Sequence, residues 1–184
     1  MRLRSIFVSV ATIGLMVGPA FVHGVVGSVA GAAKDCTIRG TAADDDLTGT
    51  TRADVICTKA GSDSAAGLEG NDVIRGGQGD DNSGAYGGLC GGDGSDTVKG
   101  QQDDDNVEGA GQNDNLRGGQ GDDYLGYEGT SAPQCDINEP GNDFLKTRDG
   151  VSGNDELDGG ANTDTCEIDA GDQIDNNDGL GCEL

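Results

Sequence analysis

The sequence predicts an all-β chain that folds as a parallel β-roll, a solenoid of nonapeptide repeats with disulfide-stapled ends. The main observation is a nine-residue pattern, Gly-Gly-x-Gly-x-Asp-x-U-x, in which U is a large apolar residue. Four stretches fit it well: GLEGNDVIR from Gly67, GGDGSDTVK from Gly91, GGQGDDYLG from Gly118 and GVSGNDELD from Gly150. A nonapeptide of this form is typical of a calcium-binding parallel β-roll.

Composition is the second observation. The 184 residues include 35 glycines, and 34 Asp plus Glu face 11 Lys plus Arg, a formal charge of −23. A chain so acidic and so poor in large apolar side chains lacks an ordinary core, so another source must supply the free energy of folding. The charge favours divalent cations as partners. It argues against nucleic acid and anionic membrane surfaces, which need a basic face.

Residues 1–32 have the form of a secretory signal peptide. Arg2 and Arg4 precede an apolar stretch, and Ala30-Gly31-Ala32 matches a cleavage pattern that makes Ala33 the expected mature start. A transmembrane anchor is the alternative, but glycines and a proline interrupt the stretch. We therefore expect a secreted, extracellular protein with no membrane insertion after cleavage. Cleavage would also remove His23, the only histidine, which argues against an enzyme that uses an imidazole.

The third observation is an even number of cysteines, 6 in all. In an exported chain this number favours three disulfide bonds, for which about fifteen pairings are possible. Proximity along the chain favours Cys36 with Cys57, Cys90 with Cys135, and Cys166 with Cys182. The first and last pairs would hold the terminal repeats, which lack one stacking neighbour. The middle pair would join two insertions.

The roll is expected over residues 33–167. Insertions are expected at 85–90 and 127–137, and a C-terminal cap without the period at 168–184. Repeat units occupy 40–84, 91–126, 138–146 and 150–167. Glycines at the first, second and fourth positions suit a loop with φ > 0 that approaches an ion closely. The eighth side chain points inward from a short strand.

The sixth position is aspartate in all twelve units, and a carboxylate is a hard oxygen ligand suited to calcium. Two units make one turn, so loops two units apart stack. Asp72 is then expected to face Asp96 across the first insertion, and Asp81 to face Asp105. Arg52 should weaken the site beside Asp54. The candidate ligands are Asp45, Asp54, Asp63, Asp72, Asp81, Asp96, Asp105, Asp114, Asp123, Asp143, Asp155 and Asp164, with the intact loops at Asp72, Asp96, Asp123 and Asp155 as the best sites.

These units resemble the repeats-in-toxin, or haemolysin-type, family of calcium-binding nonapeptide repeats. The resemblance covers residues 40–167 and implies a right-handed β-roll with several Ca²⁺ ions in its loops. The opening CTIRGTAADDDLTGT and the closing GGANTDTCE also resemble small stand-alone secreted bacterial members. Family toxins and proteases carry a separate functional domain, which is not found here, and they leave by a C-terminal signal rather than an N-terminal one.

The sequence thus predicts a secreted calcium-binding protein that folds on binding calcium, with a structural or adhesive role and no enzymatic activity. Its protein or surface partner is not identified. The alternative is an acidic protein that binds mineral or ice. A regular row of Thr or Asn on one face would favour ice, whereas a chain that stays disordered with calcium would favour mineral.

Overall fold

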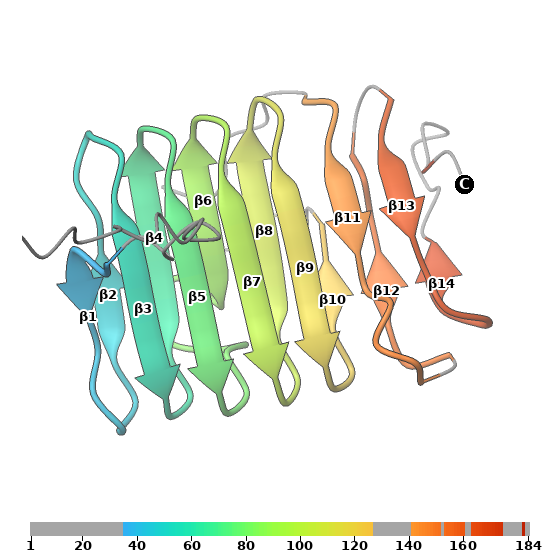
Figure 1. The fold of residues 1–184 in the computed structure, drawn as a ribbon, viewed down its shortest axis with the longest axis horizontal. Coiled ribbons are helices and arrows are strands. Elements are labelled where there is room, and N and C mark those ends of the chain that lie inside the picture. Colours follow the sequence, from blue (N-terminus) through green and yellow to red (C-terminus); the bar gives the residue numbers. More distant parts are fainter. Residues whose placement is uncertain (1–34, 127–140, 152, 161–162, 175–181, 183–184) are drawn as a thin grey trace, which may run out of the picture. The chain divides into compact units, whose positions relative to one another are not determined.

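The structure is a computed structural model that describes residues 35–126, 141–151, 153–160, 163–174 and 182. Its strands form two parallel sheets, and successive strands along the chain belong alternately to one sheet and the other (Figure 1). Sheet A contains β1 (Ile38–Arg39), β3 (Val55–Ala60), β5 (Val73–Gln78), β7 (Thr97–Gln102), β9 (Asn115–Gln120), β11 (Phe144–Lys146) and β13 (Thr165–Glu167). Sheet B contains β2 (Asp46–Thr48), β4 (Ser64–Glu69), β6 (Leu89–Asp93), β8 (Asn106–Gly111), β10 (Tyr124–Leu125), β12 (Glu156–Leu157) and β14 (Gln173–Ile174).

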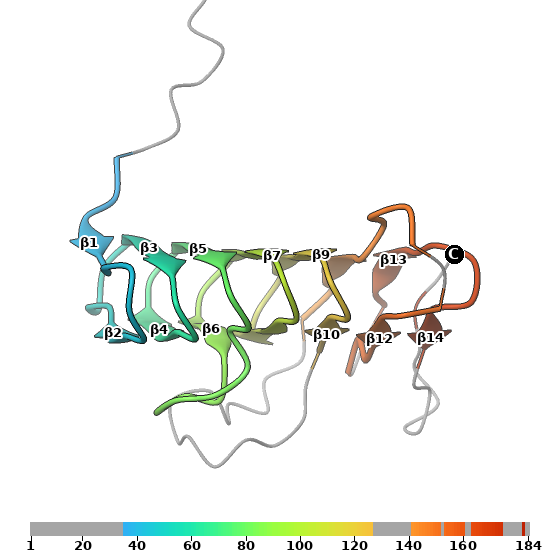
Figure 2. The same ribbon diagram turned by 90° about the horizontal axis from the view of Figure 1, so that it is seen from below.

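The two sheets are layers that face each other (Figure 2). Eighth-position side chains lie in register along each sheet, as Ile56, Ile74 and Val98 do in sheet A. Side chains of both sheets meet in one core cluster, in which Ile56 and Leu125 are 0% exposed. One apolar residue per strand is therefore enough to build a core, because the turns stack and bring these residues together in one cluster. The all-β parallel roll predicted from the repeats is confirmed.

The first insertion lies earlier than expected. The sequence placed Ser83 at the inward position and residues 85–90 outside the repeat. In the structure Ser83 is exposed, and Leu89, 1% exposed, pairs with Ala65 and Val107 in sheet B. The extra residues thus lie between Asp81 and β6. The reason is that burying the apolar side chain of Leu89 at the inward position is more favourable than burying the serine hydroxyl.

The repeats also extend beyond residues 40–167. At the start, Ile38 in β1 pairs with Ile56. At the end, Ile174 in β14 pairs with Leu157, although the cap expected over 168–184 was thought to lose the period. Asp172 and Ile174 stand at the sixth and eighth positions of this further unit, which begins at Glu167.

Two of the expected disulfides are present, Cys36–Cys57 and Cys166–Cys182, with Cα–Cα distances of 5.9 and 5.4 Å. Cys90 is disulfide-bonded as well. Its expected partner, Cys135, lies outside the described residues. The expected insertion at 127–137 and the expected signal peptide at 1–32 also lie outside them. Within the described part of the chain, no helix is long and apolar enough to span a bilayer.

Candidate calcium sites

The twelve sixth-position aspartates form two columns. Each aspartate comes immediately before a strand, except Asp81, which is followed by the first insertion and then by β6. Each column therefore follows the loops that lead into one sheet. The column that leads into sheet A contains Asp54, Asp72, Asp96, Asp114, Asp143 and Asp164; the column that leads into sheet B contains Asp45, Asp63, Asp81, Asp105, Asp123 and Asp155. The structure therefore brings together all the candidate ligands, including Asp72 with Asp96 and Asp81 with Asp105 across the first insertion.

Hydrogen bonds fix the carboxylates within each column. Except in the last aspartate of each column, Asp155 and Asp164, the backbone N–H donates to Oδ1 of the aspartate one turn further along the chain, as Asp54 does to Asp72 at 2.7 Å and Asp81 to Asp105 at 3.0 Å. The bond persists across the longer connection from Asp123 to Asp155, at 2.8 Å. One oxygen of each acceptor carboxylate is thus used to hold the stack together.

The second oxygen, Oδ2, is buried in most turns. Among the described residues it accepts no hydrogen bond in Asp72, Asp81, Asp96, Asp105, Asp114, Asp123 and Asp155. A buried carboxylate oxygen with no partner is strongly unfavourable. Each of these loops therefore requires either a proton or a cation on that oxygen.

The pKa values reflect the same burial. Burial, reinforced by the neighbouring Asp81 carboxylate, raises the pKa of Asp105 to about 8. Burial likewise raises the pKa of Asp96 and Asp123 to about 7. Carboxylates that hold protons near neutral pH in the absence of an ion are those that a divalent cation would deprotonate on binding.

Glycines bring backbone close to these oxygens. Most first-position glycines pack against Oδ2 of their own unit, so that a Cβ on Gly159 would lie 2.6 Å from Oδ2 of Asp164. Apart from Gly150, whose φ is 94°, the backbone conformation of the described first-position glycines does not require glycine. Positive φ instead occurs at the second and fourth positions, as at Gly92 (108°) and Gly70 (122°), which corrects the expectation that all three positions need φ > 0.

The donor set fits calcium. Carbonyl oxygens at the second and fourth positions face the loop one turn on, as that of Gly61 does toward Gly79. Among the described residues, no three His, Cys, Asp or Glu side chains gather at one point. An ion would therefore combine carboxylate oxygens of stacked turns with backbone carbonyls, and calcium accepts about six to eight such oxygens.

The first two loops differ from the rest. Oδ2 of Asp45 and Oδ2 of Asp54 each accept hydrogen bonds from the threonine at the second position, Thr41 and Thr50. These oxygens have a protein partner and do not depend on an ion. Arg52 alone predicts a weak site beside Asp54. The threonines are a second feature of these two loops, visible in the sequence as Thr in place of Gly at the second position of both units.

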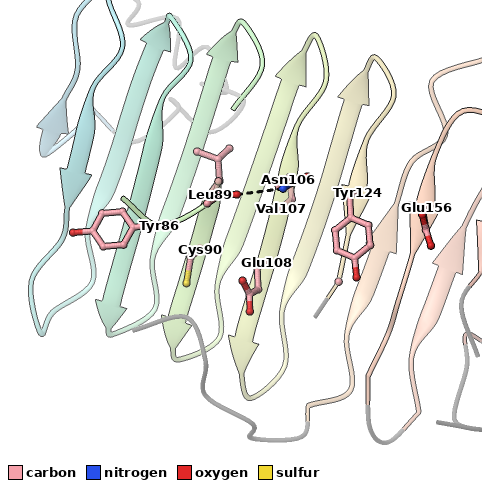
Figure 3. Close-up of a pocket in the computed structure, with 11 residues that line it drawn as sticks. Tyr86, Leu89, Cys90, Asn106, Val107, Glu108, Tyr124 and Glu156 are labelled. Carbon is pink, nitrogen blue, oxygen red and sulfur yellow. Dashed lines mark hydrogen bonds between the residues drawn. The ribbon is translucent and has the colours of Figure 1, made fainter. Parts of the chain in front are cut away.

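A pocket of about 340 Å³ lies on the outer face of sheet B (Figure 3). Tyr86 and Tyr124 line it, with Cys90 and the buried Glu108 between the two rings. The Tyr86 hydroxyl is hydrogen-bonded to Thr48. The two rings are separated by this row, so they do not form one continuous stacking surface.

Comparison with known proteins agrees with this geometry. Residues 58–83 and 91–125 match the family model of the RTX calcium-binding nonapeptide repeat in four copies. Searches for similar curated proteins and similar solved structures found no match. The matched residues contain both aspartate columns from Asp63 to Asp123, and RTX nonapeptide repeats bind Ca²⁺. Residues 58–83 and 91–125 are therefore identified as RTX calcium-binding nonapeptide repeats.

Proposed function

We propose that this is a secreted protein that folds on binding calcium through its sixth-position aspartates and then serves a structural or adhesive role outside the cell. The observation that carries the proposal is the row of buried Oδ2 atoms, such as those of Asp96 and Asp105, that accept no hydrogen bond within the described residues. Without calcium these loops hold protons or repelling charges. With calcium the same oxygens become ligands.

The magnitudes favour a folding switch. At calcium ten times the dissociation constant, one site stabilises the folded state by about 1.4 kcal/mol. Several such sites together equal a large part of the roughly 5–15 kcal/mol that holds a typical domain folded. Binding can thus decide whether the roll forms. Extracellular calcium modules typically bind at about 10⁻⁴ to 10⁻³ M, a range that suits a site loaded after export.

The expected location rests on two further observations. The chain begins with a signal-like segment over residues 1–32, and the cysteines at both ends of the roll form disulfides. Disulfides persist in oxidising compartments. A binding role is preferred over catalysis because the single histidine, His23, precedes the expected cleavage site.

The test is a far-UV circular dichroism titration of the oxidised, exported protein with calcium, and separately with magnesium. We expect a cooperative change from coil to β at about millimolar calcium, and no such change with magnesium, which gives up its water reluctantly. A spectrum that stays coil at saturating calcium would overturn the proposal and favour the acidic mineral-binding alternative. A spectrum already β without calcium would mean that the disulfides hold the fold.

A further inference from the structure

The outer face of sheet A carries a row of cations, here called the basic ladder. It consists of the ninth-position residues Arg39, Arg75, Lys99, Arg117 and Lys146. Cross-strand register places Arg75 opposite Lys99, Lys99 opposite Arg117, and Arg117 opposite Lys146. Cys57, which pairs with both Arg39 and Arg75, takes the remaining position. Adjacent strands lie about 4.7–4.9 Å apart, so the cations follow one another at a regular spacing.

This arrangement is not expected from charge pairing alone. Like charges directly opposite each other on neighbouring strands are destabilising, and the chain has 34 acidic residues that could alternate with the cations. The neighbouring outward row is instead uncharged, with Val73, Thr97 and Asn115 beside the central cations. Burial and the nearby Arg117 and Arg75 lower the pKa of Lys99. Lys146, at the end of the ladder, is paired with Glu167 on the next strand. Around Lys99 and Arg117 the ladder keeps an unfavourable concentration of positive charge that an anionic ligand would relieve.

A cavity beside the ladder supplies hydrogen-bonding groups. It has a volume of about 340 Å³ and is lined by Lys59, Arg75, Gln78, Gln101 and Gln102, among others. The amide of Gln78 donates to Oε1 of Gln102 at 3.1 Å, and Gln102 is in register with Gln120 on the next strand. A row of amides therefore accompanies the row of cations.

We propose that the outer face of sheet A binds a linear acidic polysaccharide, with its carboxylate or sulfate groups on the basic ladder and its hydroxyls on the glutamine row. This assigns a partner to the adhesive role and rests on the proposed calcium-dependent fold, because only the folded roll brings the ladder residues into register. The ladder is one side chain wide, which matches a narrow polymer that runs across the strands.

Other polyanions fit this face less well. Single-stranded nucleic acid binds on aromatic side chains that stack with its bases, and among the described outward positions of the ladder strands Phe144 is the one aromatic residue. A duplex or an anionic bilayer is wide, so its phosphates would also lie over the loops on either side. There, exposed carboxylates that are not candidate calcium ligands, such as those of Asp104 and Asp122, would repel them. The amides have sugar hydroxyls as natural partners.

The test measures binding of a fluorescent chondroitin sulfate oligosaccharide by anisotropy at saturating calcium, with neutral dextran as the control ligand. Arg117→Gln removes an exposed ladder guanidinium, and Arg52→Gln removes an exposed guanidinium from a loop away from the ladder. We expect R117Q to bind several-fold more weakly, with a salt dependence reduced by about one charge. R52Q should bind like the parent protein.

Each other outcome overturns the proposal. Equal losses in R117Q and R52Q would mean diffuse attraction rather than a ladder. Tighter binding of a single-stranded oligonucleotide or of anionic vesicles would assign the face to another class of partner. Self-association that R117Q abolishes, measured by sedimentation, would assign it to a second copy of the chain. Circular dichroism of the same samples separates the two proposals: a coil at saturating calcium overturns both, whereas a β-roll that ignores the oligosaccharide overturns the ladder alone.

Discussion

Thr50 donates two hydrogen bonds to Oδ2 of Asp54, one from its backbone N–H and one from its hydroxyl, both at 2.8 Å. Thr41 makes the same pair of bonds to Asp45, at 2.6 and 2.8 Å. In later turns this oxygen is the candidate calcium ligand. The first two loops thus use a threonine where the others are expected to use an ion, and they can order without calcium.

Removing the hydroxyl of Thr50 should therefore loosen the first turn of the calcium-free protein. We expect Thr50→Val to lower the local stability by about 1.5 kcal/mol, the lower end for a hydrogen bond to a charged group. Amide hydrogen exchange of residues 41–57 in calcium-free buffer measures this. Thr51→Val is the control, since Thr51 is an exposed neighbour of the same type. Equal exchange in the two variants would show that the threonine does not cap the loop.

Neighbouring aspartates at positions five and six should respond differently to loss of charge. Asp123 is 3% exposed and its Oδ1 accepts the N–H of Asp105, whereas Asp122 is exposed. Asp123→Asn should raise the calcium concentration at the folding midpoint, because it removes a ligand charge from two adjacent sites. Asp122→Asn makes the same change in net charge and should leave the midpoint nearly unchanged. A shift of equal size in both, measured by calcium titration, would contradict the assignment of the sixth position.

Without calcium, the roll should be more stable at mildly acidic pH than at alkaline pH. Burial raises the pKa of Asp81 to about 7 and that of Asp114 to about 8, far above the ordinary value near 3.9. Between these values the folded chain holds more protons than the unfolded chain, so the free energy of unfolding falls as pH rises from about 4 to about 8.

Calcium should reverse this trend, because it binds the deprotonated carboxylates. The measurement is circular dichroism at pH 5 and pH 8.5, each with and without calcium. At pH 5 exposed carboxyl groups stay ionised, so general acid unfolding does not interfere. A calcium-free β signal that increases toward pH 8.5 would contradict the burial of these aspartates.

Two adjacent residues near the end of β7, ahead of Asp105, should show opposite effects. A Cβ on Gly100 would collide with the carboxylate of Asp105, whereas Gln101 has a φ of 101°, a conformation that favours glycine. We expect Gly100→Ala to weaken both folding and calcium binding, and Gln101→Gly to stabilise the folded state by about 1 kcal/mol. Calcium midpoints and urea denaturation of the calcium-loaded protein compare the two. Effects of the same sign in both variants would contradict this backbone geometry at the end of β7.

Much of the roll could be predicted because the repeat carries its own register. Within a unit the aspartate always stands two positions before the apolar residue, as Asp72 does before Ile74 and Asp96 before Val98. This fixed spacing predicts which side chain enters the core and which carboxylate lies in the loop. The stacking of Asp81 on Asp105 followed from counting two units per turn, and it survived the insertion between them.

Two features of the structure could not be predicted from the positions within a single repeat unit: the place of the first insertion and the basic ladder. Ser83 was placed in the core because the frame was continued without a gap, although burial favours Leu89 a few residues later. The basic ladder was hidden by the net charge of −23, since its members lie in every second unit and meet only when the sheet forms. Total charge predicts no partner that needs a basic face, because it does not show how the charges are distributed over the faces of the folded chain.

Because calcium binds in the aspartate columns, the net charge of the protein, and with it the electrophoretic mobility, should depend on the calcium concentration. Each divalent ion held between two stacked carboxylates, such as those of Asp96 and Asp114, cancels their charge, whereas the cations on sheet A remain. The isoelectric point, about 4.1 for the bare chain, must therefore rise as the sites fill. Because proteins are least soluble near zero net charge, the same ions that order the chain also reduce its solubility, and it is the folded form that is disposed to settle on a surface.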